Sequence, residues 1–287
     1  MGQPMAARLL QAGYALRVWN RTLAKTVSCR ELGAMVAATP AEAVADADMI
    51  ITMLEAGPVV QNVLTEASIR IRRGTLAIDM SSTRQSEAVA LHAMLAEKGI
   101  EFMDAPVSGG VLGAESGRLA IMVGASGENY KRAQPVLAVL GNPTLVGPPG
   151  TGQLAKLCNQ LIVGGTLNLV AEALLLAQAG GADPAAVRSA LRGGFAESKI
   201  LEVHGQRMLE RNFMPGGQVK SQSKDMDNIL AAAQAANLTL PQAELIAQVY
   251  HRLLASDPHA DQSAALLDLE RQNSGLRLGT IPDKKPD

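Results

Sequence analysis

The sequence predicts an α/β domain with a doubly wound parallel sheet, followed by an all-helical domain. In the first half, short runs rich in Val, Ile and Met alternate with Ala-rich segments of helical period, which is the pattern of parallel strands joined by crossover helices. A breaker cluster, Gly147-Pro148-Pro149-Gly150, closes this half, and helical period alone continues after it. We therefore expect domains over 1–149 and 150–274, with a Gly-, Pro- and charge-rich flexible tail over 275–287.

The first domain opens with a helical pattern over Gln3–Ala12. Proline at a first helical turn, in Thr39-Pro40 and Gly57-Pro58, marks two later helix starts. The expected strands are Tyr14–Asn20, Asp48–Leu54, Thr75–Asp79, Ile100–Asp104 and Leu119–Gly124. The expected helices between and after them are Thr22–Leu32, Pro40–Ala47, Pro58–Ala67, Gln85–Lys98 and Gly127–Leu140.

The second domain begins with a long uninterrupted helical pattern over Gln153–Ala179, which ends at Gly180-Gly181. At about 1.5 Å per residue this helix is roughly 40 Å long, enough to connect two domains. Further helices are expected over Pro184–Arg192, Lys199–Arg211, Ser223–Ala236, Pro241–Leu254 and Asp261–Gln272.

Composition excludes several classes of protein. Lys plus Arg total 26 and Asp plus Glu total 27, and aromatic residues are 2%, so neither a basic platform nor a base-stacking surface for nucleic acid is expected. Two cysteines and four scattered histidines without ligand spacing predict no metal site. No apolar run approaches the roughly 20 residues of a membrane span, and residues 1–20 lack a secretory signal. We therefore expect no membrane association and a cytoplasmic setting.

The N-terminal segment Met1-Gly2 resembles the end of a dinucleotide-binding glycine turn. Such a Rossmann fingerprint needs a strand and then glycines whose N–H groups approach a pyrophosphate at a helix N-terminus. Here the strand and the first two glycines are missing from the sequence. We expect a Rossmann-type sheet without its first strand, and a start site assigned some ten residues late.

The end of the next predicted strand favours NADP(H) over NAD(H). An NAD-specific domain usually carries an acidic residue at this point to bind the ribose 2′-hydroxyl, whereas this chain carries Asn20, Arg21 and Thr22. A guanidinium and a hydroxyl suit a 2′-phosphate through charge-assisted hydrogen bonds. The alternative interpretation is a solvated Arg at a surface turn.

Two further segments indicate chemistry on a small carboxylate. The loop Asp104-Ala105-Pro106-Val107-Ser108-Gly109-Gly110 offers a hydroxyl and backbone N–H groups after a strand. Lys156 lies one turn into the long helix, with Asn159 and Gln160 at i+3 and i+4 on the same face. A partly desolvated ammonium is a credible proton donor to a developing alkoxide.

These segments together resemble the β-hydroxyacid dehydrogenase family. The motifs are MGQPMA, WNRT, DMSS, DAPVSGG, GTGQLAK and SKDM, in that order, and the resemblance covers residues 1–272. It implies that Met53, Leu54, Ser82 and Lys224 join Met1, Gly2, Asn20, Arg21 and Thr22 at the cofactor. It also implies that Ser108, Gly109 and Gly110 hold the substrate carboxylate and that Lys156 is the acid/base. Asp225 we interpret as a helix N-terminal carboxylate.

We therefore expect an NADP(H)-dependent oxidoreductase that interconverts a short hydroxy acid and its aldehyde or keto acid. The substrate classes are 3-hydroxyisobutyrate, tartronate semialdehyde, glyoxylate and succinic semialdehyde, and the sequence does not choose among them. Whether Asn159 or Gln160 touches substrate also stays open. Alternatives are an imine reductase on the same fold and a catalytically silent dinucleotide-binding scaffold. The resemblance and the apolar helices predict a homodimer or homotetramer.

Overall fold

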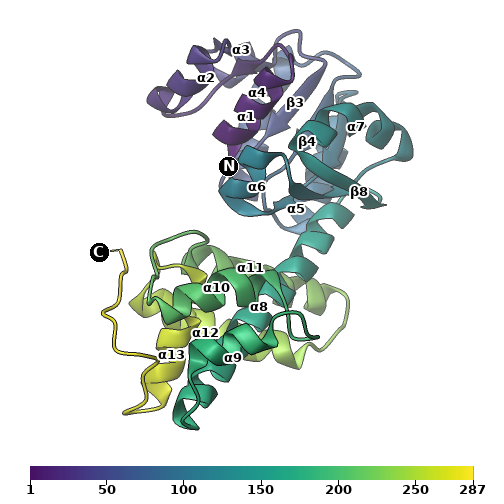
Figure 1. Cartoon of the computed structure of the whole chain (residues 1–287). Helices are drawn as coiled ribbons and strands as arrows, with labels where there is room; N and C mark the ends of the chain where they lie inside the picture. The colour runs from purple at the N-terminus through teal and green to yellow at the C-terminus, as the bar shows by residue number, and fades with distance from the viewer. Residues whose placement is uncertain (287) are drawn as a thin grey trace. The chain divides into compact units, whose positions relative to one another are not determined.

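The computed structural model describes residues 1–286 and divides the chain into two compact units. The first is Met1–Lys156, and the second begins at Leu157 (Figure 1). The division lies seven residues beyond the predicted boundary at 149, because the long helix α8 (Thr151–Ala179) begins inside the first unit. The α/β class of the first unit and the helical class of the second are as predicted.

The main sheet of the first unit has six strands in the order β3-β4-β5-β7-β6, with β8 paired to β7. The pairs β3–β4, β4–β5 and β7–β8 are parallel. The pairs β5–β7 and β6–β7 are antiparallel, so the sheet is mixed on this side rather than parallel throughout. Strands β6 and β8 were not predicted. The bounds are β3 (Met49–Thr52), β4 (Leu76–Asp79), β5 (Glu101–Asp104), β6 (Val107–Ser108), β7 (Leu119–Gly124) and β8 (Gly141–Gly147).

A second, two-stranded sheet is formed by β1 (Arg17–Val18) and β2 (Met35–Val36), which pair in parallel. Only two residues of the predicted strand Tyr14–Asn20 are therefore extended and paired. Within residues 1–286, no backbone ladder joins β1 to β3. The two sheets are thus separate between β1 and β3, which is the position where we expected a strand to be missing.

Helices cover both faces of the main sheet, as a doubly wound fold requires. Along β4, Leu76 and Ile78 belong to one apolar cluster while Ala77 belongs to another, because successive strand side chains point to opposite faces. The cluster with Leu76 includes Met5 of α1, and the cluster with Ala77 includes Leu64 of α4. The helices of this unit are α1 (Gly2–Gln11), α2 (Val27–Glu31), α3 (Pro40–Val44), α4 (Gly57–Ala67), α5 (Gln85–Glu97), α6 (Gly110–Ser116) and α7 (Gly127–Leu140).

The helical unit packs around a single large apolar cluster that includes Leu167 of α8, Tyr250 and Leu253. No strand longer than an isolated bridge occurs between Leu157 and residue 286, as predicted. Besides α8, its helices are α9 (Pro184–Leu191), α10 (Lys199–Leu209), α11 (Val219–Ala235), α12 (Pro241–Ser256) and α13 (Ala265–Gln272).

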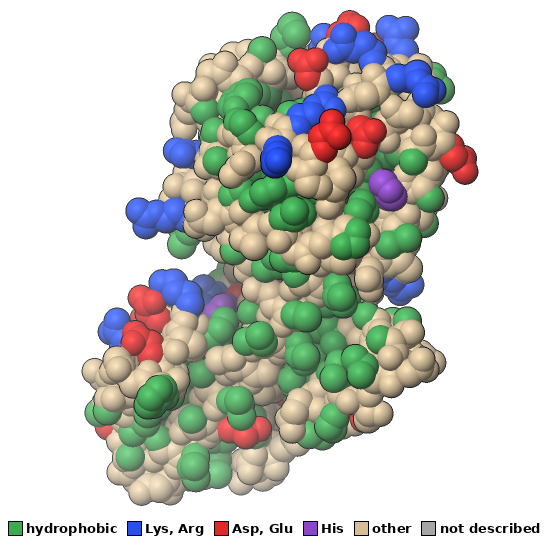
Figure 2. All heavy atoms as spheres, turned by 90° about the vertical axis from the view of Figure 1, so that its right-hand side faces the viewer, with side chains coloured by type: hydrophobic (Ala, Val, Ile, Leu, Met, Phe, Trp, Pro, Cys, Tyr) green, Lys and Arg blue, Asp and Glu red, His purple; other side chains and the backbone are tan. Residues whose placement is uncertain are grey.

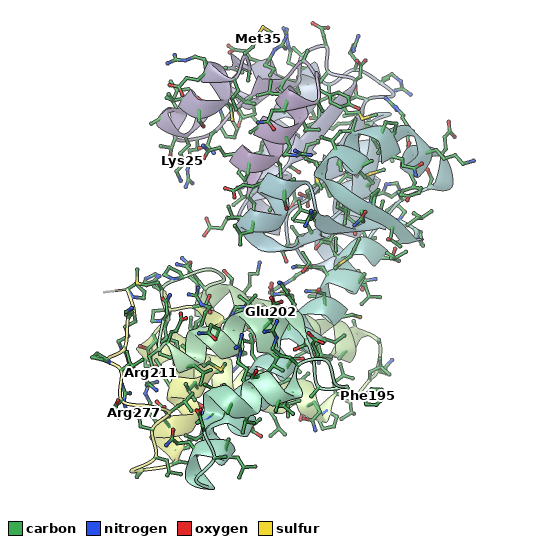
Figure 3. The ribbon with its side chains drawn as sticks, viewed as in Figure 1. Lys25, Met35, Phe195, Glu202, Arg211 and Arg277 are labelled. Carbon is green, nitrogen blue, oxygen red and sulfur yellow. The ribbon has the colours of Figure 1, made fainter. Side chains whose placement is uncertain are left out.

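The expectation of a flexible tail over 275–287 needs correction for residues 275–286, while residue 287 lies outside the described residues. Arg211, which is fully buried, forms ion pairs with Glu270 and with Asp283 of the tail. The backbone N–H of Phe213 donates to the carbonyl of Lys284 at 2.7 Å. Figure 3 shows Arg211 and Arg277 beside the C-terminal segment of the helical unit. The tail is held because its charged residues meet buried partners, which its composition did not reveal.

Candidate active site

Two buried carboxylates stand at the carboxyl ends of neighbouring strands. Asp79 ends β4, and its Oδ1 accepts hydrogen bonds from Thr52 Oγ1 at 2.8 Å and from the Ser81 N–H at 3.1 Å. Burial raises the pKa of Asp79 above its ordinary value, although the hydrogen bonds from Ser81 and Thr52 oppose the shift. Asp79 thus fixes the turn that leads to the predicted cofactor residue Ser82.

Asp104 at the end of β5 anchors the start of helix α8. Its two carboxylate oxygens accept from the backbone N–H groups of Gly150 at 2.6 Å and Gln153 at 2.7 Å. These are N–H groups that a helix start leaves without a partner. Burial raises the pKa of Asp104 to about 6, against the lowering effect of these two hydrogen bonds. A Cβ on Gly152 would lie 2.5 Å from the Met122 carbonyl oxygen, so glycine is required for α8 to begin this close to the sheet.

Gln153 ties α8 to the loop that follows β4. Its Oε1 accepts from the Thr83 N–H at 3.0 Å, and its Nε2 donates to the Ser81 carbonyl at 2.8 Å. The side chain is completely buried. Lys156 lies three residues further along the same helix and is partly buried. The predicted acid/base and the loop carrying Ser82 are therefore held by one rigid, hydrogen-bonded connection.

The predicted cofactor residues near the N-terminus are brought together in the first unit. A Cβ on Gly2 would lie 3.6 Å from the Cβ of Met53, so the start of α1 faces the end of β3. The backbone N–H of Leu54 donates to Ser81 Oγ at 2.9 Å. This hydrogen bond connects the ends of β3 and β4 beside Ser82.

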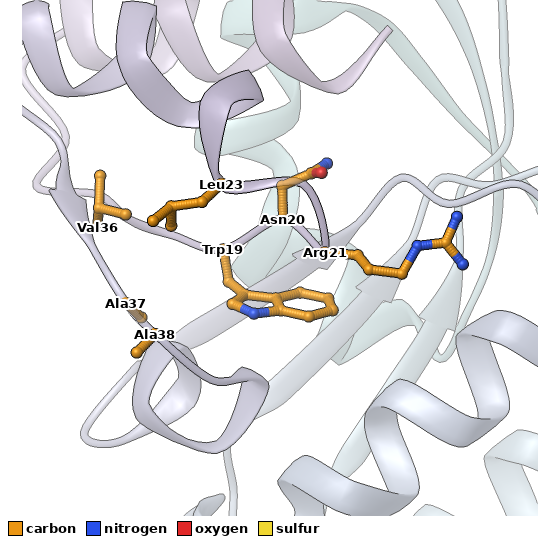
Figure 4. Close-up of a pocket in the computed structure, with 7 residues that line it drawn as sticks. All are labelled: Trp19, Asn20, Arg21, Leu23, Val36, Ala37 and Ala38. Carbon is orange, nitrogen blue, oxygen red and sulfur yellow. The ribbon is translucent and has the colours of Figure 1, made fainter.

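Two of the residues predicted to select the cofactor, Asn20 and Arg21, line a cavity of about 410 Å³. Asn20 and Arg21 follow β1, and the Asn20 Oδ1 accepts from the Thr22 N–H at 2.9 Å, which closes the turn. In Figure 4 the ring of Trp19 lies across the cavity, and the Arg21 side chain extends from the same turn. Arg21 and Thr22 are exposed. The remaining lining residues are Leu23, Val36, Ala37 and Ala38.

The predicted carboxylate-binding loop connects β6 to α6. Ser108 pairs with Ala120 in the sheet, and Gly109 and Gly110 follow with φ angles of 131° and 64°. Both angles lie in the region that favours glycine. The two glycines are exposed and Ser108 is partly exposed, so their polar groups can reach a small ligand.

The second unit holds the remaining predicted residues in one hydrogen-bonded group. Asn159 Nδ2 donates to Gln160 Oε1 at 2.8 Å, and Gln160 Nε2 donates to Asp225 Oδ2 at 2.8 Å. The Nζ of Lys224 lies 3.5 Å from Asp225 Oδ1. Helix α11 begins at Val219 rather than Ser223. Asp225 is therefore a buried partner of Gln160 inside the helix, and our interpretation of it as an N-terminal carboxylate was wrong.

Sequence reasoning missed Asp79, Asp104 and Gln153. Each lies inside a motif that we quoted, but none carries a recognisable chemical task by itself. A usable signal was available, since a carboxylate at the last position of an apolar strand is buried and needs donors. Among residues 1–286, no group of three or more His, Cys, Asp or Glu side chains is arranged to hold a metal ion.

Comparisons with known proteins agree with this architecture. Residues 1–152 match the family model described as the NAD binding domain of 6-phosphogluconate dehydrogenase, and residues 150–269 match the NAD-binding domain of NADP-dependent 3-hydroxyisobutyrate dehydrogenase. The chain is 39% identical over 279 residues to 2-hydroxy-3-oxopropionate reductase of Escherichia coli, covering 94% of each chain. It is 31% identical to an NAD-dependent L-serine dehydrogenase of Pseudomonas aeruginosa, covering 93% of each.

Solved structures show the same fold. The 3-hydroxyisobutyrate dehydrogenase of Mycobacterium tuberculosis, solved with L-serine, superposes with a TM-score of 0.86 at 31% identity, covering 94% of this chain and 95% of that one. An imine reductase from a Pseudomonas species reaches a TM-score of 0.63 at 20% identity, a likeness of fold alone.

The family models and the named relatives indicate an oxidoreductase that uses a pyridine nucleotide and acts on a hydroxy acid or its carbonyl form. The chain belongs to the β-hydroxyacid dehydrogenase family.

Proposed function

We propose that the protein is an NADP(H)-dependent reductase of short aldehyde or keto acids, with tartronate semialdehyde and glyoxylate as the first candidates. The observation that carries this proposal is the fixed start of α8, where Asp104 and Gln153 hold the helix that bears Lys156. The similarity to the E. coli 2-hydroxy-3-oxopropionate reductase supports the choice of substrate class.

The residues present fit a dinucleotide. Gly2 and Met53 lie together at the end of β3, and Asn20 and Arg21 line the cavity at the end of β1. Exposed Arg21 would bind a 2′-phosphate, which favours NADP(H) over NAD(H). The nicotinamide, when bound, supplies or accepts the hydride.

The substrate's carboxylate would bind to Ser108 and to the backbone N–H groups of Gly109 and Gly110. This would fix the position of the neighbouring carbonyl. The Lys156 ammonium would donate a hydrogen bond to the carbonyl oxygen, stabilise its growing negative charge and deliver the proton from Nζ. Asn159 or Gln160, one turn later on α8, would orient the same oxygen.

The test offers the protein four substrates: tartronate semialdehyde, glyoxylate, succinic semialdehyde and methylmalonate semialdehyde. The decrease in NADPH absorbance measures the reduction of each. Lys156→Ala should lower kcat by roughly a hundredfold or more while NADPH binding is kept. Lys156→Arg should not restore turnover, because a guanidinium does not release its proton. Lys131→Ala, at an exposed position of α7, is the matched control.

Two results would contradict the proposal. Turnover of Lys156→Ala within threefold of the parent would remove the acid/base role of this lysine. Binding of NADPH without reduction of any of the four substrates would favour the silent scaffold, and reduction of cyclic imines in their place would favour an imine reductase.

A further inference from the structure

A buried amide, Gln222, joins helices α8 and α11 in the core of the helical unit. Its residue is 1% exposed. Val219, Met226 and Ile229 of α11 belong to the apolar cluster of this unit, and their spacing places Gln222 on the same apolar face of the helix. Burying an amide costs free energy unless it is hydrogen-bonded. Hydrophobic side chains lie in the open on one face of the same unit (Figure 2), so sorting by polarity does not explain this amide.

Both polar atoms of the Gln222 side chain pair with Gln160 of α8. The Gln222 Nε2 donates to the Gln160 carbonyl oxygen at 3.1 Å, and the Gln222 Oε1 accepts from Gln160 Nε2 at 3.1 Å. A carbonyl oxygen inside a helix ordinarily accepts from the N–H four residues later, so Gln222 adds a second donor there. Two directed hydrogen bonds to one residue fix the position of α11 on α8 more closely than apolar packing does.

A glycine of α8 provides the space for this contact. A Cβ on Gly164 would lie 2.7 Å from Gln222 Nε2, too close for a non-bonded contact, and 3.2 Å from Ile246 Cγ2. Glycine is a weak helix former, yet Gly164 lies inside a helix of 29 residues. At the neighbouring Gly165, a Cβ would lie 3.3 Å from Ile246 Cδ1 and would not meet Gln222. Gly164 is therefore the glycine that the Gln222 contact requires.

The same amides determine how the Asn159 side chain is turned. Asp225 Oδ2 accepts from Gln160 Nε2 at 2.8 Å, and a carboxylate oxygen can only accept, so the amide nitrogen of Gln160 faces α11. Together with Gln222 Oε1, this gives both N–H groups of that nitrogen an acceptor. The Gln160 Oε1 then accepts from Asn159 Nδ2 at 2.8 Å. The Asn159 side chain keeps its second N–H and its Oδ1 for another partner.

We propose that Gln222 is a positioning residue, which holds the Gln160 amide so that Gln160 turns Asn159 toward the substrate. The inference rests on the proposed function, because the substrate is assigned to Lys156, one turn earlier on the same helix. It also chooses between the two amides of α8. Gln160 is committed to α11, and Asn159 contacts the substrate.

The first experiment compares alanine at the two adjacent glycines of α8. Alanine is the better helix former at either position. We expect Gly164→Ala to lower kcat/KM by roughly tenfold or more, because its Cβ displaces the Gln222 amide. Gly165→Ala, which also approaches Ile246 but not Gln222, should stay within roughly threefold of the parent. Circular dichroism verifies that both variants fold, and equal kcat/KM values for the two would overturn the proposal.

The second experiment removes the Gln222 amide and keeps its volume. Gln222→Met leaves Gln160 Nε2 with its Asp225 acceptor, so the chain should fold. We expect kcat/KM to fall by roughly tenfold or more. The Kd for NADPH should change little, since most residues predicted to bind the nucleotide belong to the first unit. Gln234→Met, at an exposed position of the same helix, is the matched control. Lower stability with unchanged kinetics would show a purely structural role and overturn the proposal.

A double-mutant cycle tests whether Gln222 acts through Asn159. Asn159→Ala alone should lower kcat/KM by roughly tenfold or more. Adding Gln222→Met should lower it no further, because the amide that Gln222 positions is then absent. Losses that multiply in the double variant would show two independent effects and overturn the proposal.

Binding of glycerate in the presence of NADP⁺ separates this inference from the proposed function, because it needs no turnover. Glycerate is the product of reducing tartronate semialdehyde. In calorimetry, Gln222→Met should raise the Kd for glycerate by roughly tenfold or more. A parent chain that binds glycerate but reduces none of the four substrates would refute the reductase alone. Reduction by the parent, with equal kcat/KM and equal Kd for Gln222→Met, would overturn the inference alone. A parent that neither binds glycerate nor reduces a substrate would overturn both.

Discussion

Replacing Gln153 with methionine tests whether this side chain holds the start of α8. Methionine has a similar length and fills the same buried space, but it has no amide. The Thr83 N–H loses its acceptor and the Ser81 carbonyl loses its donor, and both groups stay away from water because Gln153 is 0% exposed. The substitution therefore isolates two hydrogen bonds without opening a cavity.

The expected loss follows from the cost of an unpaired buried group, about 1–3 kcal/mol each. Two such groups give a decrease of about 2–6 kcal/mol in the free energy of unfolding. For a unit of this size, the melting temperature should fall by roughly 5–25 °C. Gln153→Glu should lose at least as much at neutral pH, because its buried carboxylate loses its solvation and places an oxygen against the Ser81 carbonyl.

Urea unfolding followed by circular dichroism measures the loss, with Gln134→Met at an exposed position of α7 as the control. If Gln153 also positions Lys156, kcat should fall by at least tenfold while the Kd for NADPH changes little, because small displacements of a catalytic group are costly. A Gln153→Met variant within about 1 kcal/mol of the parent would refute the account of this connection.

Three further predictions concern single side chains. Arg21→Glu should raise the Kd for NADPH by roughly ten- to a hundredfold and leave the Kd for NADH nearly unchanged. Fluorescence titration measures both constants, and an equal loss of affinity for the two nucleotides would show that Arg21 only supports the fold. The pKa of Asp104 is raised by burial to about 6 from an ordinary 3.8, so the folded state binds its proton more tightly. Its ionised form therefore destabilises the fold, and this contribution to the free energy of unfolding should fall by up to about 3 kcal/mol as pH rises from 4 to 6. Asp104→Asn should remove that slope in urea titrations, and an unchanged slope would contradict the shift. Arg211→Met should destabilise the helical unit by about 3–5 kcal/mol, since Glu270 and Asp283 lose a buried partner; a loss below 1 kcal/mol in the same assay would show that the tail is not held by this arginine.

The strands and helices that the sequence predicts well are those with buried apolar faces. In β4 all four residues from Leu76 to Asp79 are buried, and such a continuous apolar run identifies a central strand. Strand β8 was not predicted because residues from Asn142 to Val146 are partly or fully exposed, and exposed strand residues need not be apolar. Its place is set by pairing with β7, which is a tertiary contact rather than a local preference.

The same difference applies to the site. Residues expected to touch small molecules carry a chemical signature, and we could propose Lys156, Ser108 and Arg21 from their types and spacing. Residues that hold those groups act through contacts between distant segments, such as Gln153 with Thr83, which are 70 residues apart. One sequence contains no signal for such a pair until the fold brings its members together.

The connection at α8 also explains the glycines before Lys156. The motif Gly150-Thr151-Gly152-Gln153 looks like a breaker followed by a helix, and its glycines are easily attributed to phosphate binding. The structure gives them a different task, because Gly152 permits close approach to the sheet and the N–H of Gly150 donates to Asp104. Burying the Asp79 and Asp104 carboxyls raises their pKa values and thereby weakens the fold at neutral pH. Since an apolar contact could close the same space without that loss, stability alone does not account for these groups. Directed hydrogen bonds fix the relative positions of two segments more closely than apolar contacts do. We infer that the hydrogen bonds of these carboxyl groups fix the position of Lys156 relative to the loop that carries Ser82.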